Sequence, residues 1–194
     1  MARSAFDFIV LDAQRKVTKA FSKQIEAVPK AMKKGARRAI SRTLTTARKE
    51  TSQAIRDDLA LRAGDIKDRI EKKIVWDFEG KLTVKDRRLE LIKFRTPRET
   101  SRRRRRSGGG GVNVTIYKKK GRQLIKGAFI NKGRKKGRLH VMKREETSRY
   151  PIKILYGPSI AKTASRHLPR ILARTEPVFE KNLAHEIDRA LRKV

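Results

Sequence analysis

The side chains that could carry acid–base or metal chemistry are few in this sequence, and they are scattered. The three histidines are His140, His167 and His185, and no cysteine occurs. The pair His185-Glu186 matches the start of the zinc-protease pattern HExxH. Arg189, however, stands where the second histidine ligand should be, so we expect an ordinary surface helix there. The sequence also lacks the phosphate-binding pattern GxxxxGK(S/T), and it therefore predicts no catalytic site, no metal, no cofactor and no enzyme.

The strongest chemical signal is instead positive charge, which is concentrated between Ser101 and Arg144. This segment holds 17 Lys and Arg residues and no Asp or Glu, about half of the chain's net charge of +33. It opens with five consecutive arginines, Arg102–Arg106, and continues with Ser107 and four glycines, Gly108–Gly111. Because a surface of this charge repels itself, it must meet something acidic.

Three basic loops supply the candidate contacts with an acidic partner or with DNA. For the arginine run two interpretations stay open: a solvated loop or arm that orders only against a partner, or direct phosphate contact. In the second case the arginines would bind without reading sequence, because nothing holds them against base edges. The candidate residues are Arg102, Arg103, Arg104, Arg105, Arg106, Lys118, Lys119, Lys120, Arg122, Arg134, Lys135, Lys136 and Arg138.

The composition narrows the class of protein. With 194 residues, of which 37% are hydrophobic and 38% charged, the chain can bury a core, but a lean one that we expect partners to complete. A pI near 11.4 leaves nucleic acid, anionic membrane and acidic proteins as candidate partners. The lack of cysteine suits a reducing cytoplasm. The apolar run Phe8–Leu11 is too short for a signal peptide or a membrane span, so we expect a soluble protein.

The first third of the chain has the period of helices. Apolar residues from Phe6 to Val28 lie on one stripe, and Pro29 should end that helix. A longer helix is predicted over Lys30–Leu59, with a narrow buried stripe of Ala and Thr that would allow close approach of another helix or a sheet. Gly64 then predicts a stop, and Asp65 the N-cap of a short helix that ends near residue 70.

After residue 73 the hydrophobic period changes to that of strands. Three short strands are predicted, at Ile74–Phe78, Lys81–Lys85 and Arg88–Phe94, with Trp76 as a possible core anchor. The segment 96–107 should be a loop, and with Gly108–Gly111 it should act as a flexible tether.

The basic segment itself predicts an antiparallel sheet with charged loops. Val112–Tyr117 alternates apolar and polar residues, as a half-buried strand does. A second extended run covers Gln123–Asn131 and a third lies around Leu139–Met142, with basic turns at Lys118–Arg122 and Lys132–Arg138.

The end of the chain returns to the helical period. The segment from Tyr150-Pro151 to Gly157-Pro158 should turn the chain, and a final helix should carry apolar residues from Ala164 to Leu191 on one face. Pro169 is tolerable near a helix start, whereas Pro177 should kink or divide the helix.

Together these patterns predict an α+β fold. It has N-terminal helices, a central antiparallel β-sheet with long basic loops, and a C-terminal helix packed on the sheet. We expect a single domain over residues 1–194. Its parts would be a helix at 1–29, a helical part at 30–72, a sheet at 73–144 with a flexible loop at 96–111, and a turn and helix at 145–194.

One weaker pattern points to RNA. Lys126–Ile130 partly matches the RNA-binding signature of RRM domains, but Ala128 occupies the position of the required aromatic residue and no second aromatic motif is present. Phe129 is therefore predicted to be a core residue.

Four stretches taken together resemble a known family. They are Ala39–Arg56, Leu89–Phe94, Gly127–Ile130 and Pro151–Ile171, and the turn LYGPS in the last of them is the most recognisable. In this order and spacing they resemble the minor tail protein Z family of tailed bacteriophages and prophages, over roughly residues 30–192. None of the four stretches is a catalytic motif.

The resemblance implies a structural protein of the virion at the head-proximal end of the tail. There it would complete the tail and join it to the head, as part of a neck around the DNA channel. The implied partners are the tail terminator, tail tube and head–tail connector proteins, a homo-oligomeric ring of six copies or a multiple, and genomic double-stranded DNA, with no membrane. Assembly would occur in the host cytoplasm. The alternative, which rests on charge alone, is a stand-alone nucleic-acid-binding protein that is ribosomal or nucleoid-like.

Overall fold

The computed structural model describes residues 30–76, 79–100, 109–132, 137–146, 148 and 150–192. The helix predicted over 6–28 and the arginine run at 102–106 lie outside these residues. The chain forms two compact units. Unit 1 comprises Met1–Ala54, Arg69–Lys85 and Ala164–Val194, and unit 2 comprises Ile55–Asp68 and Asp86–Thr163. The single domain over the whole chain stays a prediction.

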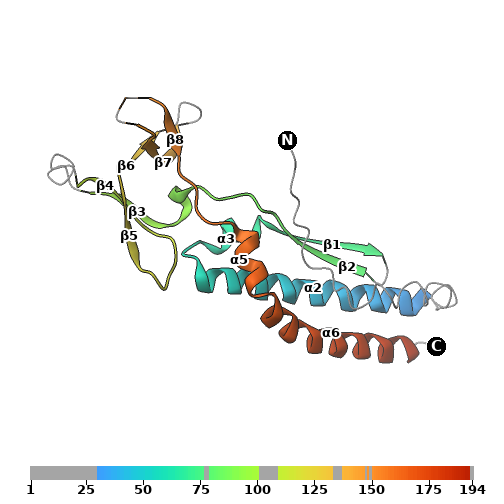
Figure 1. Cartoon of the computed structure of the whole chain (residues 1–194). Helices are drawn as coiled ribbons and strands as arrows, with labels where there is room; N and C mark the ends of the chain where they lie inside the picture. The colour runs from blue at the N-terminus through green and yellow to red at the C-terminus, as the bar shows by residue number, and fades with distance from the viewer. Residues whose placement is uncertain are drawn as a thin grey trace. The chain divides into compact units, whose positions relative to one another are not determined.

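Unit 1 is built on two long helices and a hairpin (Figure 1). The predicted helix at 30–59 is confirmed as α2, Lys30–Asp58, whose last turn belongs to unit 2. The strands β1, Ile70–Trp76, and β2, Glu79–Val84, pair antiparallel, with Ile70 opposite Val84. The last helix is α6, Leu168–Leu191.

The narrow Ala and Thr stripe of α2 is buried, as its spacing predicted. Ala39 is fully buried, and Thr43 turns its hydroxyl back to the Ala39 carbonyl at 2.9 Å. The hairpin packs on the same helix at Gly80, where a Cβ atom would lie 2.5 Å from Ile40 and 2.8 Å from Leu44. A glycine is therefore required at this contact. The side chain of Trp76, the predicted core anchor, lies outside the described residues.

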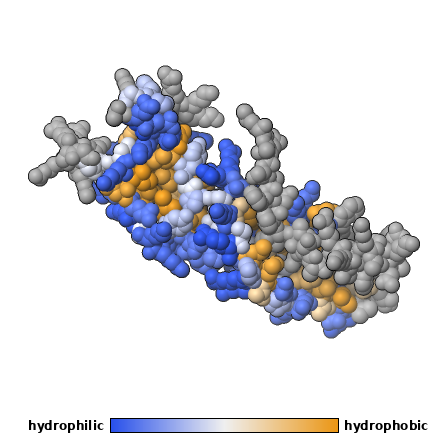
Figure 2. All heavy atoms as spheres, in the orientation of Figure 1, coloured by the Kyte–Doolittle hydropathy of each residue, from blue (hydrophilic) through white to orange (hydrophobic). Residues whose placement is uncertain are grey.

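Unit 2 is built on two three-stranded antiparallel sheets, ordered β3-β4-β5 and β6-β7-β8. Val112, Val114 and Val141 are fully buried in its core, and Figure 2 shows a hydrophobic area over this unit bordered by hydrophilic residues. The elements are α3, Ala63–Lys67; a 3-10 turn η2, Leu91–Lys93; β3, Arg95–Glu99; β4, Gly111–Thr115; β5, Arg122–Lys126; β6, Ala128–Lys132; β7, Leu139–Arg144; β8, Ile152–Ile154; and most of α5, Ile160–Arg166.

The prediction of one extended run over 123–131 was wrong. Gly127 has φ +72°, a left-handed conformation that favours glycine, and it separates β5 from β6, which belong to different sheets. The central sheet predicted over 73–142 is for the same reason three separate sheets. Periodicity alone could not find this break, because both strands share the alternating pattern.

Two predictions about the middle of the chain were also wrong. Arg88–Phe94 is no strand: it makes a single bridge at Glu90 and then the turn η2. The predicted loop after residue 96 begins instead as the strand β3, despite Pro97. Because β3 is an edge strand whose register shifts between Arg95 and Arg98, the missing N–H group of proline is tolerated there.

Three boundaries differ from the predictions at helix ends and turns. The N-cap of α3 is Arg62, and Asp65 lies in the first turn of that helix. The predicted turn at 150–158 contains the strand β8. Helix α6 continues through Pro177, and the division falls at His167 instead. Pro177 and Ala173, whose carbonyl loses its helical donor, are both exposed, so water can satisfy that carbonyl.

The predicted class is confirmed: helices at both ends of the described chain enclose antiparallel strands, which is an α+β fold. The contacts of α6 described below are with α2. No helix among the described residues is both long and apolar enough to cross a membrane.

Candidate functional site

The β4–β5 hairpin presents the best described part of the predicted basic surface. Lys118, Lys119 and Lys120 form its turn and are exposed, and Arg122 opens β5 beside them, also exposed. Gly121 closes the turn with φ +66°, and its N–H group donates to the Lys118 carbonyl at 3.3 Å. The sequence predicted this turn, and the structure brings these four cations together at one tip.

The turn is anchored to the end of α2. The Lys118 N–H group donates to the Asp58 carbonyl at 3.0 Å, and Leu59 and Tyr117 form an antiparallel bridge. The Lys120 ammonium lies over the Tyr117 ring, 5.4 Å from its centroid, which is within the range of a cation–π contact. Main-chain bonds therefore hold the backbone of the turn, while its ammonium groups stay in solvent.

The second basic loop lies elsewhere in unit 2. Arg138 follows Gly137, which has φ +58°, and is exposed just before β7. Strands β5 and β6 run away from their shared corner at Gly127, and at about 3.3 Å per residue each covers roughly 15 Å. The lysine turn precedes β5 and Arg138 follows β6, so the structure separates them (Figure 1). The remaining candidates, Arg102–Arg106 and residues 134–136, lie outside the described residues.

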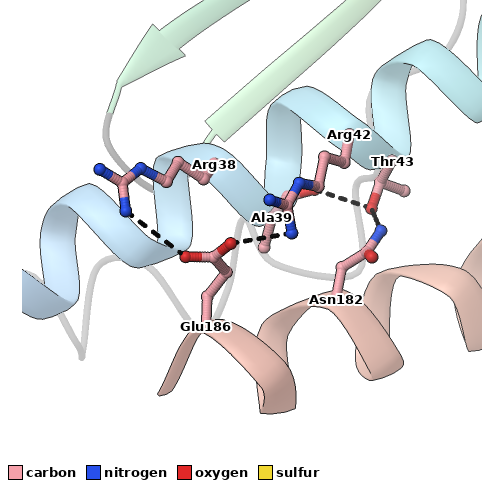
Figure 3. Close-up of polar contacts among 6 residues, drawn as sticks. All are labelled: Arg38, Ala39, Arg42, Thr43, Asn182 and Glu186. Carbon is pink, nitrogen blue, oxygen red and sulfur yellow. Dashed lines mark hydrogen bonds and ion pairs between the residues drawn. The ribbon is translucent and has the colours of Figure 1, made fainter. Parts of the chain in front are cut away.

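A buried carboxylate between α2 and α6 was missed by sequence reasoning (Figure 3). Glu186, which we expected on a helix surface, has a fully buried side chain. Its Oε1 lies 2.9 Å from Arg42 Nη1, and its Oε2 lies 3.8 Å from Arg38 Nη1. Both arginines are about half exposed. The contact is an ion pair with one desolvated and one solvated side, and because no substrate can reach Glu186 it is structural.

Small residues bring the two helices close enough for this ion pair. A Cβ atom at Gly35 would lie 3.3 Å from the Glu186 carbonyl oxygen, and the Asn182 amide donates to the Thr43 hydroxyl at 3.3 Å. The signal was present in the helical period: Glu186 follows Leu183 by three positions and precedes the buried Ala190 by four. The charge of Glu186 hid a position that belongs to the buried stripe.

The histidines do not form a site. His140 on β7 bonds to Glu90 through Nδ1 at 2.7 Å, and both side chains are partly buried. His167 lies between α5 and α6, and His185 is exposed, as expected. Within the part of the chain that the structure describes, no three His, Cys, Asp or Glu side chains gather in a way that could hold a metal ion.

The region of the RRM-like pattern is also structural. Ala128 is buried, and Phe129 is half-buried with the Arg144 guanidinium over its ring, 5.9 Å from the centroid. Phe129 therefore supports the sheet only in part, since one side of the ring remains accessible.

Comparison with known proteins gives one family. The model described as prophage minor tail protein Z (GPZ) matches residues 13–194, nearly the whole chain. No curated protein and no solved structure gives a significant match. The family match includes both units and every element described above, and it makes the chain a structural protein of a phage tail. The chain belongs to the prophage minor tail protein Z family.

Proposed function

We propose that this protein completes a phage tail at its head-proximal end and joins the tail to the head. It does so as part of a neck around the DNA channel, in a homo-oligomeric ring of six copies or a multiple. The observation that carries the proposal is the family match over residues 13–194. The exposed lysine turn suggests how such a subunit holds its neighbours, the tail terminator, the tail tube and the head–tail connector.

Rough charge arithmetic favours proteins over DNA as the main partners of the basic loops. A length of about 40 Å of duplex carries on the order of 24 negative charges. With about six copies, the segment from Ser101 to Arg144 alone would bring on the order of 100 positive charges to a ring, far more than this DNA neutralises. A lumen lined with all of them would also trap DNA that must later leave. At most one basic loop per subunit therefore faces DNA, and the others dock on acidic protein surfaces, where complementary charge speeds assembly and sets register.

The lysine turn offers a direct test. In a phage that carries Lys118, Lys119 and Lys120 changed to Ser, we expect head–tail joining to fall by about tenfold or more, because charge complementarity raises association rates by that much. The anchoring main-chain bonds should keep the hairpin folded. A matched variant that also loses three charges changes Arg62, Arg87 and Arg88 to Ser, all exposed and in unit 2.

The arginine run requires its own measurement. With Arg102–Arg106 changed to Ser, we expect tail-to-head joining to fall while DNA stays in the particles that do join. Loss of DNA from particles that join normally would assign these arginines to the genome instead. Normal joining and normal DNA retention in both sets of variants would remove charge from the proposed mechanism.

The alternative, a stand-alone nucleic-acid-binding protein, predicts a different result. The purified chain would then bind short duplexes as a monomer, with an affinity that falls steeply with salt, and it would not co-purify with tail or connector proteins. Electron microscopy of the neck would decide the position in the particle directly.

A further inference from the structure

The sheet β6-β7-β8 has one open edge, at β8. The Leu155 N–H group donates to the Val141 carbonyl at 2.9 Å, and the Glu145 N–H group donates to the Pro151 carbonyl at 3.1 Å. Because the bonding groups of an antiparallel strand alternate sides, residues 151, 153 and 155 face β7. Ile152 and Ile154 therefore direct their N–H and C=O groups outward, where no described backbone group pairs with them.

The opposite edge of the same sheet is covered. On β6 the Ile130 N–H group donates to Glu99 Oε1 at 2.6 Å, and the Lys132 N–H group donates to the Asn131 side chain at 2.8 Å. Side chains therefore occupy donors along β6, whereas the described chain leaves β8 without such a cap. An open edge is a template for another strand.

The side chains around the open edge are apolar on one face of the sheet. Phe129, Met142 and Ile154 stand in one row across the three strands, because Phe129 pairs with Met142 and Met142 with Ile154. All three are half-buried, as is Ile152 at the edge. Tyr156, just past the strand, is 51% exposed. A strand added beside β8 would extend this row and cover it.

On the other face of the sheet the edge is positively charged. Lys143 and Lys153 are directly opposite each other on β7 and β8, a like-charge pair that disfavours the sheet. Glu145 pairs with Lys153 at 2.9 Å, and Lys143 has no ion pair among the described residues. An acidic residue placed beside Lys153 by an added strand would relieve the repulsion.

A second copy of this chain does not fit the edge. Two β8 strands paired about their centres would bring Lys153 against Lys153, in a chain whose net charge is already +33. The partner must be acidic where this chain is basic.

We propose that β8 accepts an extended segment of an acidic partner protein, which adds a fourth strand to the sheet β6-β7-β8. The segment has the pattern apolar–acidic–apolar, with its acidic residue beside Lys153 and its apolar residues beside Ile152 and Ile154. Main-chain bonds supply the affinity, and the alternating side chains supply specificity. The inference rests on the proposed function only in that a neighbouring protein of the virion supplies the strand.

The first test uses the full-length protein and synthetic peptides. A peptide of alternating valine and glutamate should bind and slow hydrogen exchange at the Ile152 and Ile154 amides. A peptide of the same composition, with the valines and the glutamates in separate blocks, controls for attraction by net charge. We expect the alternating peptide to bind about tenfold more tightly, since only it can place both sets of side chains while it pairs with the edge. Equal affinities, or no change in exchange at these amides, would overturn the proposal.

Two variants make the test specific. Ile154→Pro removes an outward N–H group without breaking a bond to β7, so circular dichroism should show a folded chain that binds the alternating peptide about tenfold more weakly. Ile154→Thr keeps the N–H group and is the matched control. Lys153→Glu should reverse the preference, toward a peptide of alternating valine and lysine. Undiminished binding by folded Ile154→Pro would contradict strand addition.

A second readout separates this inference from the proposed function. A phage that carries Ile154→Pro should complete fewer tails than one that carries Ile154→Thr. Peptide binding reports on the edge whatever the role of the protein, whereas loss of tail completion on removal of the whole chain reports on the role alone. If peptides bind as expected but Ile154→Pro assembles normally, strand addition in the virion is refuted while the tail-completion role stands.

Discussion

Glu186 shows how the cost of a charged residue depends on which partner is removed. The carboxylate is fully buried, but the two arginines that face it are half exposed. If the carboxylate is lost, water can solvate the arginines. If Arg42 is lost, the buried charge keeps only Arg38 at 3.8 Å.

We therefore expect Arg42→Ala to destabilise the fold more than Glu186→Gln does. The expected loss in the free energy of unfolding for Arg42→Ala is about 3 kcal/mol, the range for stranding a buried charge. Urea titration followed by helical circular dichroism measures both values. Arg37→Ala, an exposed neighbour on the same helix, is the control and should change stability by less than about 0.5 kcal/mol. The reverse order of the two losses would mean that the carboxylate does not need Arg42.

The histidines call for unequal expectations. His185→Ala should leave infectivity unchanged, since the residue is exposed. His140→Ala should lower stability by about 1–2 kcal/mol, because the partly buried Glu90 loses a hydrogen bond at 2.7 Å. Thermal unfolding and plaque counts on the single variants separate the two. A loss of infectivity in a normally stable histidine variant would revive the enzymatic interpretation.

At the scale of elements, the turn LYGPS has a packing reason for its glycine. A Cβ atom at Gly157 would lie 2.3 Å from Phe94 Cζ, and Phe94 is 2% exposed in the core of unit 2. The Gly157 N–H group also donates to the Leu89 carbonyl at 2.8 Å. Two of the stretches that carried the resemblance, Leu89–Phe94 and Pro151–Ile171, are thus one packed contact.

Gly157→Ala should consequently destabilise the protein by about 1–3 kcal/mol, the usual cost of overpacking a core. Combining it with Phe94→Leu, which makes room, should cost less than the sum of the two single changes. Gly64→Ala is the matched control: nothing lies within 4 Å of its Cβ position, and it should leave stability unchanged or raise it by up to about 1 kcal/mol. A neutral Gly157→Ala in thermal unfolding would show that Phe94 is free to move.

At the scale of the whole molecule, each unit is assembled from separate parts of the chain. Unit 2 takes Ile55–Asp68 and Asp86–Thr163, and the segments before, between and after them belong to unit 1. Removal of the C-terminal helix therefore takes one wall of unit 1 and leaves the chain of unit 2 whole.

A chain that ends at His167 should lose amide protection along α2 but keep it in the buried strands β4 and β7. The reason is that Ala39 and Thr43 pack toward α6, whereas Val112, Val114 and Val141 belong to unit 2. Hydrogen exchange resolved along the chain measures both. Loss of protection in β4 and β7 as well would show that the two units fold as one.

Local patterns determined much of this protein. The helix at 30–58, the strand at 111–115 and the lysine turn followed from apolar spacing and from residue types, because each depends on neighbours within a few positions of the chain. The charge, and with it the need for an acidic partner, followed from composition alone.

Only the tertiary structure decided the rest, because contacts far apart in the sequence set it. Gly127 assigns two similar strands to different sheets, and α2 buries Glu186 on a helix that reads as amphipathic without it. The strand β8 is short and lies inside an apparent turn, so pairing with β7, rather than any pattern of its own, makes it a strand. Which main-chain groups remain open at that edge is a property of the pairing, and no sequence pattern encodes it.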